Sequence, residues 1–180
     1  MFKILSTRSE GRCSNQTSRP SYDEPFSTLE SQTSLQQSEQ QALYETAVYP
    51  MISSLFAGIN VTVLAYGQTG SGKTFTMGTN ASTLGGENAG VIPRIIEEIF
   101  KRVEAREDKG RVLASFLEIH NDDIIDLLSG SSTPCSLRED TSGVVVAGLK
   151  EVAISGATEM LDLLNKGSNQ RATASTNMNR

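Results

Sequence analysis

The residues whose types and spacing could do chemistry lie in the stretch AYGQTGSGKTFTMG, Ala65 to Gly78. It contains the four residues that define the pattern G-x-x-x-x-G-K-[ST], the phosphate-binding P-loop: Gly67, Gly72, Lys73 and Thr74. Glycines allow a tight turn that brings successive backbone N–H groups toward one point, at a helix N-terminus whose dipole favours an anion. The lysine adds a mobile positive charge for the outer phosphates, and the threonine hydroxyl is a ligand for Mg²⁺. The stretch therefore predicts a site for phosphate groups and magnesium.

The elements on either side of this stretch are those that a phosphate-binding loop requires. NVTVLAY, Asn60 to Tyr66, is a short β-branched run that predicts a buried strand. KTFTM, directly after the glycines, predicts the start of a short helix. The alternative is a glycine-rich turn that only resembles a P-loop, and the strand–loop–helix context favours the P-loop.

The chain from Gln40 onward alternates predicted helices and strands. Helices are predicted for QALYETAVYPMISSLFAG, in which Pro50 should kink or restart the helix, for VIPRIIEEIFKRVEAR and for GATEMLDLLNKGSNQRATAS. Strands are predicted for RVLASFLEIH, SLRED and VVVAGLKEVAI, whereas NDDIIDLL predicts a turn and a short helix. This order predicts an α/β layered fold.

Composition excludes some classes of function. The 180 residues suffice for one domain with its own core, and the net charge of -5 argues against general nucleic-acid binding. No apolar run is long enough to cross a membrane. Cys13 and Cys135 lack metal-site spacing, so we expect two reduced thiols in an intracellular protein.

The N-terminal residues differ from the rest of the chain. Ser, Thr and Gln make up 18 of the first 40 residues, and the apolar residues among them have no period. We therefore expect residues 1–39 to be largely irregular, with only MFKIL able to pair as a short strand, and residues 40–180 to form the folded part.

Four stretches, in the same order, resemble those of kinesin motor domains. They are VLAYGQTGSGKTFTMG, GVIPRIIEEIF, SFLEIHNDDIIDLL and NKGSNQRATASTNMN. The stretches LRED…GLKEV and RATASTNMN most resemble those of the chromokinesin-type branch of the family. The resemblance implies that residues 40–180 form part of a kinesin motor fold, a three-layer P-loop NTPase sheet with helices on both faces.

The same resemblance implies a microtubule-based motor that binds and hydrolyses ATP with Mg²⁺ as cofactor. Its implied partner is tubulin, and its implied location is the microtubule cytoskeleton of the cytoplasm. By family position, the residues that surround the nucleotide are Gly67, Gln68, Thr69, Gly70, Ser71, Gly72, Lys73, Thr74 and Phe75. Among them, Thr74 is the implied Mg²⁺ ligand, and Phe75 should stack on adenine, a role that suits an aromatic ring.

The family's two switch motifs, S-S-R-S-H and D-L-A-G-S-E, do not occur in these 180 residues. Because the switches position the attacking water, we assign no catalytic residue and expect weak or no hydrolysis from this chain alone. DTSG, Asp140 to Gly143, fits the D-x-x-G γ-phosphate sensor pattern, but the polar CSLRE precedes it and favours a plain turn. Glu118 follows an apolar run as a Walker-B acid would, although its family position favours a structural strand.

The sequence leaves three candidate functions open. The first is the ATP-binding part of a kinesin motor. The second is a module derived from a kinesin that binds nucleotide or a partner without hydrolysis. The third is another P-loop NTPase, such as a small kinase or GTPase, which is disfavoured because the chain has no N/T-K-x-D base-reading motif.

Overall fold

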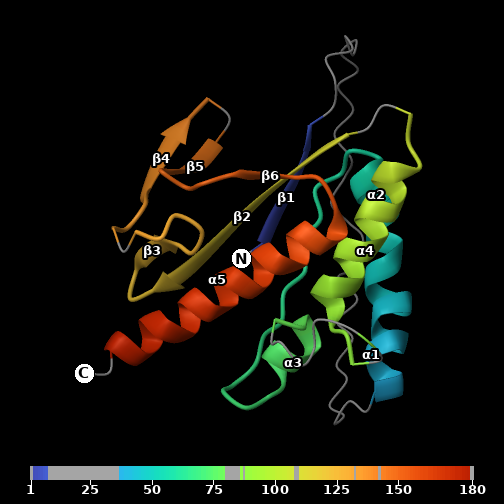
Figure 1. Ribbon diagram of the computed structural model, residues 1–180, viewed down its shortest axis with the longest axis horizontal. Coiled ribbons are helices and arrows are strands. Elements are labelled where there is room, and N and C mark those ends of the chain that lie inside the picture. The colour runs from blue at the N-terminus through green and yellow to red at the C-terminus, as the bar shows by residue number, and fades with distance from the viewer. Residues whose placement is uncertain are drawn as a thin grey trace, which may run out of the picture.

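A computed structural model describes residues 2–7, 37–79, 86, 88–107, 110–131, 133–141 and 143–178 (Figure 1). Its helices are α1 (Gln37–Leu43), the π-helical turn η1 (Tyr44–Val48), α2 (Tyr49–Phe56), α3 (Lys73–Met77), α4 (Val91–Glu104) and α5 (Ala157–Met178). Its strands are β1 (Phe2–Thr7), β2 (Arg111–His120), β3 (Asp123–Asp126), β4 (Ser136–Asp140), β5 (Gly143–Ala147) and β6 (Val152–Ile154). None of the described helices is long and apolar enough to span a membrane.

Strand β2 organises the sheet. It pairs antiparallel with β1 and β6 along its first half and with β3 along its second half, so that Ala114 lies between Ile4 and Val152. Strands β4 and β5 form a separate antiparallel hairpin. In Figure 1 this hairpin lies on the opposite side of the view from α1, α2 and α4.

The hairpin between β2 and β3 corrects the prediction of a short helix in NDDIIDLL. Asn121 (φ 48°) and Asp122 (φ 67°) both adopt the left-handed backbone. Two consecutive positive φ angles are typical of the type I′ hairpin turn, and Asn and Asp tolerate them better than other side chains do. The turn reverses the chain, and Asp123 pairs with His120.

The segment before the glycine loop corrects a second prediction. Asn60 to Tyr66 is extended, but within the described part of the chain it belongs to no sheet. Val61, Val63 and Ala65 are half-buried on one side, whereas Leu64 and Tyr66 are 83% and 101% exposed. β-branched residues favour an extended backbone, but a strand also needs a neighbour within hydrogen-bonding distance. We refer to Val61–Tyr66 as the unpaired run.

Pro50 disturbs the first helix as the sequence predicts. It lies at the start of α2, directly after the π-helical turn η1. Proline has no N–H, and its ring crowds the carbonyl four residues earlier, which here belongs to Thr46. A wider π-helical turn at this point accommodates the ring, so the helix continues beyond the proline.

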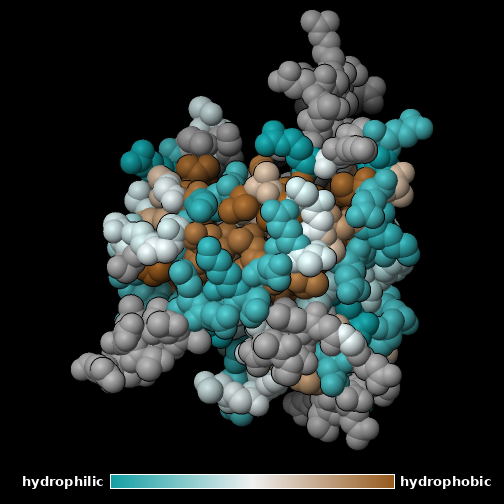
Figure 2. Space-filling view, viewed as in Figure 1, coloured by the Kyte–Doolittle hydropathy of each residue, from teal (hydrophilic) through white to brown (hydrophobic). Residues whose placement is uncertain are grey.

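One hydrophobic core joins the helices to the sheet. Alternate residues of β2 point into it: Val112, Ala114 and Phe116. The helical residues of the core that are at most 3% exposed are Val91, Ile96 and Ile99 of α4 and Met160 and Leu164 of α5. On the face of the molecule seen in Figure 2, hydrophobic residues gather in the middle, with hydrophilic residues around them. The α/β fold is thus confirmed, and the described helices form one of the two expected helical layers.

The N-terminal strand agrees with the expectation that MFKIL can pair. Strand β1 runs from Phe2 to Thr7, and helix α1 begins at Gln37. Residues 8–36, which include Cys13 and most of the segment predicted to be irregular, lie outside the described residues. The division of the chain at residue 39 therefore stays a prediction.

Candidate phosphate-binding site

The glycine loop joins the unpaired run to helix α3. Gln68 to Gly72 are exposed, and the three glycines of the loop have positive φ angles: Gly67 (152°), Gly70 (84°) and Gly72 (88°). Gly72 is the N-cap residue of α3 and adopts the left-handed conformation. A residue with a Cβ would be strained there, so the backbone conformation explains why the motif has glycine at this position.

Lys73 closes the loop from its far end. Its Nζ donates hydrogen bonds to the carbonyl oxygens of Gly67, at 2.7 Å, and Gln68, at 2.6 Å. Within the loop, the N–H of Ser71 donates to the same Gln68 carbonyl at 3.2 Å. The ammonium group thus lies over the loop backbone, where the sequence predicts the phosphates to bind.

The loop is open to solvent at two of its glycines and closely packed at the third. A Cβ added at Gly70 or Gly72 would meet nothing within 4 Å, so the loop is open to solvent there. A Cβ added at Gly67 would lie 2.5 Å from the Ser71 hydroxyl oxygen, so this position has no room for a side chain. The loop backbone is therefore open at Gly70 and Gly72, whereas the Lys73 ammonium covers the carbonyls of Gly67 and Gln68.

The next two predicted site residues lie on α3. Thr74 and Phe75 are both half-buried, and Thr74 is in the first turn of the helix. The carbonyl of Phe75 accepts a hydrogen bond from Nε2 of Gln40, on α1, at 2.8 Å. Sequence reasoning missed Gln40, although it lies on the apolar stripe of its helix, four residues before Tyr44.

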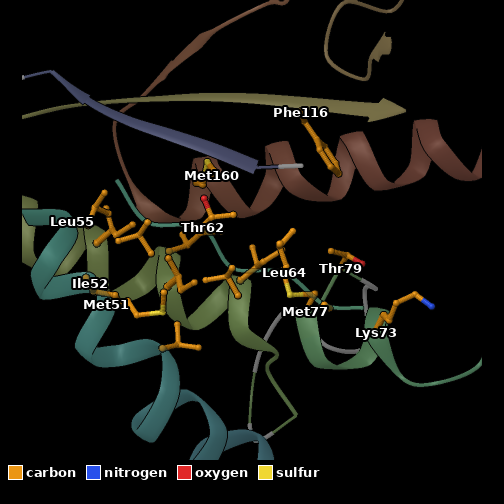
Figure 3. A pocket seen from close by; sticks show the side chains of 18 of the residues that line it. Met51, Ile52, Leu55, Thr62, Leu64, Lys73, Met77, Thr79, Phe116 and Met160 are labelled. Atoms are coloured by element: carbon orange, nitrogen blue, oxygen red, sulfur yellow. The ribbon is translucent and has the colours of Figure 1, made fainter. Parts of the chain in front are cut away.

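A cavity of about 550 Å³ lies behind the loop (Figure 3). Its lining is mainly apolar and comes from α2, the unpaired run and α4, and Lys73 and Thr74 lie at one end of it. The Lys73 side chain points away from the apolar centre of this cavity. An apolar lining does not suit a triphosphate, so the candidate site is the exposed loop and not the cavity.

The remaining sequence candidates fall outside this site. Glu118 is half-buried in β2, with its Oε1 4.0 Å from Nε of Arg171, as a structural strand position predicts. Asp140 pairs with Gly143 at the end of the β4–β5 hairpin, which confirms the plain turn. Cys135 is a free thiol, and no group of three or more metal-binding side chains occurs among the described residues.

Comparison with known proteins identifies the family. The family model described as "Kinesin motor domain" matches residues 4–180. The chromosome-associated kinesin KIF4 of Gallus gallus is 47% identical over 148 residues, which cover 78% of this chain and 12% of that protein. The kinesin-like protein KIN-4C of Arabidopsis thaliana is 43% identical over 161 residues, which cover 76% of this chain and 12% of that protein.

A solved structure agrees with these relatives. It is described as "Structure of a fast kinesin: Implications for ATPase mechanism and interactions with microtubules", and it matches with a TM-score of 0.72 and 37% identity. The match covers 78% of this chain and 40% of that chain, and the chain spans only 12% of the two relatives above. The expected likeness to the chromokinesin-type branch is confirmed by the relative from Gallus gallus. The family model, the relatives and the fold agree, and the chain belongs to the kinesin motor domain family.

Proposed function

We propose that this chain is the ATP-binding part of a microtubule-based kinesin motor and that it binds Mg²⁺–ATP at the glycine loop. The observation that carries the proposal is the loop itself: glycines with positive φ angles lead into α3, and the Lys73 ammonium lies over their backbone. Membership of the kinesin family makes a nucleoside triphosphate the ligand that this loop is expected to take.

The proposed roles follow the order of the chain. The residues that hold the phosphates through their backbone are Gly67, Gln68, Thr69, Gly70, Ser71 and Gly72. Lys73 neutralises phosphate charge, for which its ammonium exchanges the Gly67 and Gln68 carbonyls for phosphate oxygens. The Thr74 hydroxyl holds Mg²⁺, which neutralises further phosphate charge when it is bound, and the Phe75 ring stacks on adenine.

Movement along microtubules is proposed for the complete motor. The similar fast kinesin is described in terms of an ATPase mechanism and of interactions with microtubules, and these words concern that protein. By analogy, we assign this chain to a motor whose partner is tubulin and whose location is the microtubule cytoskeleton of the cytoplasm. Hydrolysis is assigned to the complete motor, because the sequence offers no group here that would position the attacking water.

Calorimetric titration of Mg²⁺–ATP into the chain and into Lys73→Ala tests this proposal. We expect the unchanged chain to bind ATP and Lys73→Ala to bind about 100-fold more weakly, because a charge-assisted contact to phosphate is lost. Lys101→Ala, an exposed lysine in the last turn of α4, is the control and should bind as the unchanged chain does. Equal affinity of Lys73→Ala and the unchanged chain would contradict the proposal. Steady-state ATPase assays with and without microtubules then distinguish a hydrolysing motor from a module that only binds.

A further inference from the structure

Gln40 lies at the contact between the first helix and the helix that follows the glycine loop. Its side chain is 0% exposed, which is unusual for glutamine. Its Nε2 donates to the main-chain carbonyl oxygen of Phe75 at 2.8 Å, across 35 positions of sequence. A buried amide on the apolar stripe of α1 therefore contacts the backbone of the proposed adenine-stacking residue.

The Phe75 carbonyl needs such a donor, because helix α3 ends too early to supply one. In a continuing helix, the N–H of Thr79 would donate to this carbonyl. Here α3 ends at Met77, Gly78 adopts the left-handed conformation, and the N–H groups of Gly78 and Thr79 both point to the Thr74 carbonyl, at 3.0 and 3.5 Å. Gln40 replaces the missing helical donor.

A short helix depends on such external contacts for its position. α3 has five residues, and a helix of that length is not stable by its own hydrogen bonds. The first helix is itself held from the other side, since Arg94 of α4 donates from Nη1 to Gln41 Oε1 and from Nε to the Ala89 carbonyl at 2.8 Å. Gln40 thus links α3 to a pair of helices, α1 and α4, that are already joined.

The carbonyl oxygen of the Gln40 side chain is buried at a cost in free energy. Oε1 of Gln40 is buried and has no hydrogen-bond partner among the described residues. An apolar side chain of similar length would avoid the loss of hydration at this oxygen. What glutamine provides at this position, and an apolar residue would not, is the hydrogen bond to Phe75.

We propose that Gln40 is a positioning residue that sets the place of Phe75 and so determines how tightly the site holds the adenine base. This inference rests on the proposed function. It divides the site into a part that holds the phosphates and a part that holds the base. Residues Gly67 to Thr74 act on the phosphates. Gln40 acts on the base through Phe75 and makes no contact with the phosphates.

The test compares Mg²⁺–ATP with inorganic Mg²⁺–tripolyphosphate, which has the phosphates but no base. Both are titrated into the unchanged chain and into Gln40→Met, which has a similar length and no donor. We expect Gln40→Met to weaken ATP binding about tenfold and tripolyphosphate binding much less, because the lost hydrogen bond is to Phe75 and not to Lys73 or Thr74. Ala42→Met, at an exposed position of the same helix, is the control and should change neither affinity.

Two further variants make the result decisive. Gln40→Asn, whose amide is too short to reach Phe75, should show the same selective loss as Gln40→Met and serves if the methionine variant does not fold. In the Phe75→Leu background, Gln40→Met should weaken ATP binding no further, because its effect passes through the phenyl ring. Equal losses for ATP and tripolyphosphate, unchanged ATP affinity, or an additive effect in the double variant would each overturn the inference. An unchanged chain that binds neither ligand would instead overturn the proposed function.

Discussion

Gly78 and Gly90 touch through their backbones, so the end of α3 and the start of α4 meet with no side chain between them. A Cβ built on Gly90 would lie 2.3 Å from both Cα and N of Gly78, and one built on Gly78 would lie 2.6 Å from Cα of Gly90. This contact fixes the C-terminal end of the helix that carries Thr74 and Phe75.

Gly90→Ala should destabilise the fold by about 1–3 kcal/mol, because the added methyl group can be accommodated only if α3 and α4 move apart. Urea unfolding followed by circular dichroism measures this free energy. Gly110→Ala is the matched control, since a Cβ at Gly110 meets nothing within 4 Å. If the two variants were equally stable, the glycine contact would have no part in holding α3 against α4.

Asp126 joins two loops at the edge of the sheet. The residue is only 3% exposed. Its two carboxylate oxygens accept hydrogen bonds from the backbone N–H groups of Leu128, at 2.8 Å, and Lys150, at 2.9 Å. Replacement by alanine leaves both donors without their acceptor. Asp126→Ala should therefore cost about 2–4 kcal/mol of unfolding free energy.

Asp126→Asn sharpens that measurement, because asparagine keeps one carbonyl acceptor and should give an intermediate loss of stability. Asp123→Ala removes an exposed carboxylate from the same strand and should cost less than either change at Asp126. Thermal and urea unfolding of the three variants rank these effects. A loss for Asp123→Ala as large as that for Asp126→Ala would refute the role of the two backbone hydrogen bonds.

Tyr44 should make the fold sensitive to alkaline pH. Burial, followed by the negative charge of Glu98, raises the pKa of Tyr44 to about 12 from its ordinary value of 10.0. The folded state therefore holds this proton more tightly than the unfolded state does. The stability that the group contributes is complete below about pH 10 and is lost as pH rises from about 10 to 12.

The stability difference between the unchanged chain and Tyr44→Phe should accordingly shrink as pH rises from about 10 to 12. Urea unfolding at a series of pH values measures it. Tyr66→Phe, at a fully exposed position, controls for the loss of a tyrosine hydroxyl. A difference that stays constant across this pH interval would show that deprotonation of Tyr44 is not coupled to folding.

The sequence alone predicts the elements whose pattern is local. Helix α4 and strand β2 occur where predicted because apolar residues at helical spacing, and a long β-branched and apolar run, each determine the element that they form. The glycine loop is equally local, since its positive φ angles fall on Gly67, Gly70 and Gly72. For these parts, residue order carries nearly all of the necessary information.

The predictions that failed or were missed depend either on a partner elsewhere in the chain or on the conformation of a turn. The run from Asn60 to Tyr66 has the composition of a strand, but strand formation is decided by a neighbour that composition does not reveal. NDDIIDLL has helical spacing, but two left-handed residues, Asn121 and Asp122, turn it into a hairpin. Gln40 could not be assigned because its role depends on a carbonyl 35 positions away.

The unpaired run has a practical consequence for work at the bench. Leu64 and Tyr66 are open to water, beside a backbone that no described strand pairs with. Unpaired backbone beside exposed apolar side chains can pair with the same segment of another molecule, so the aggregated fraction of the purified chain should rise with its concentration. Light scattering at each working concentration should come before any titration, so that clustering of molecules is not mistaken for binding.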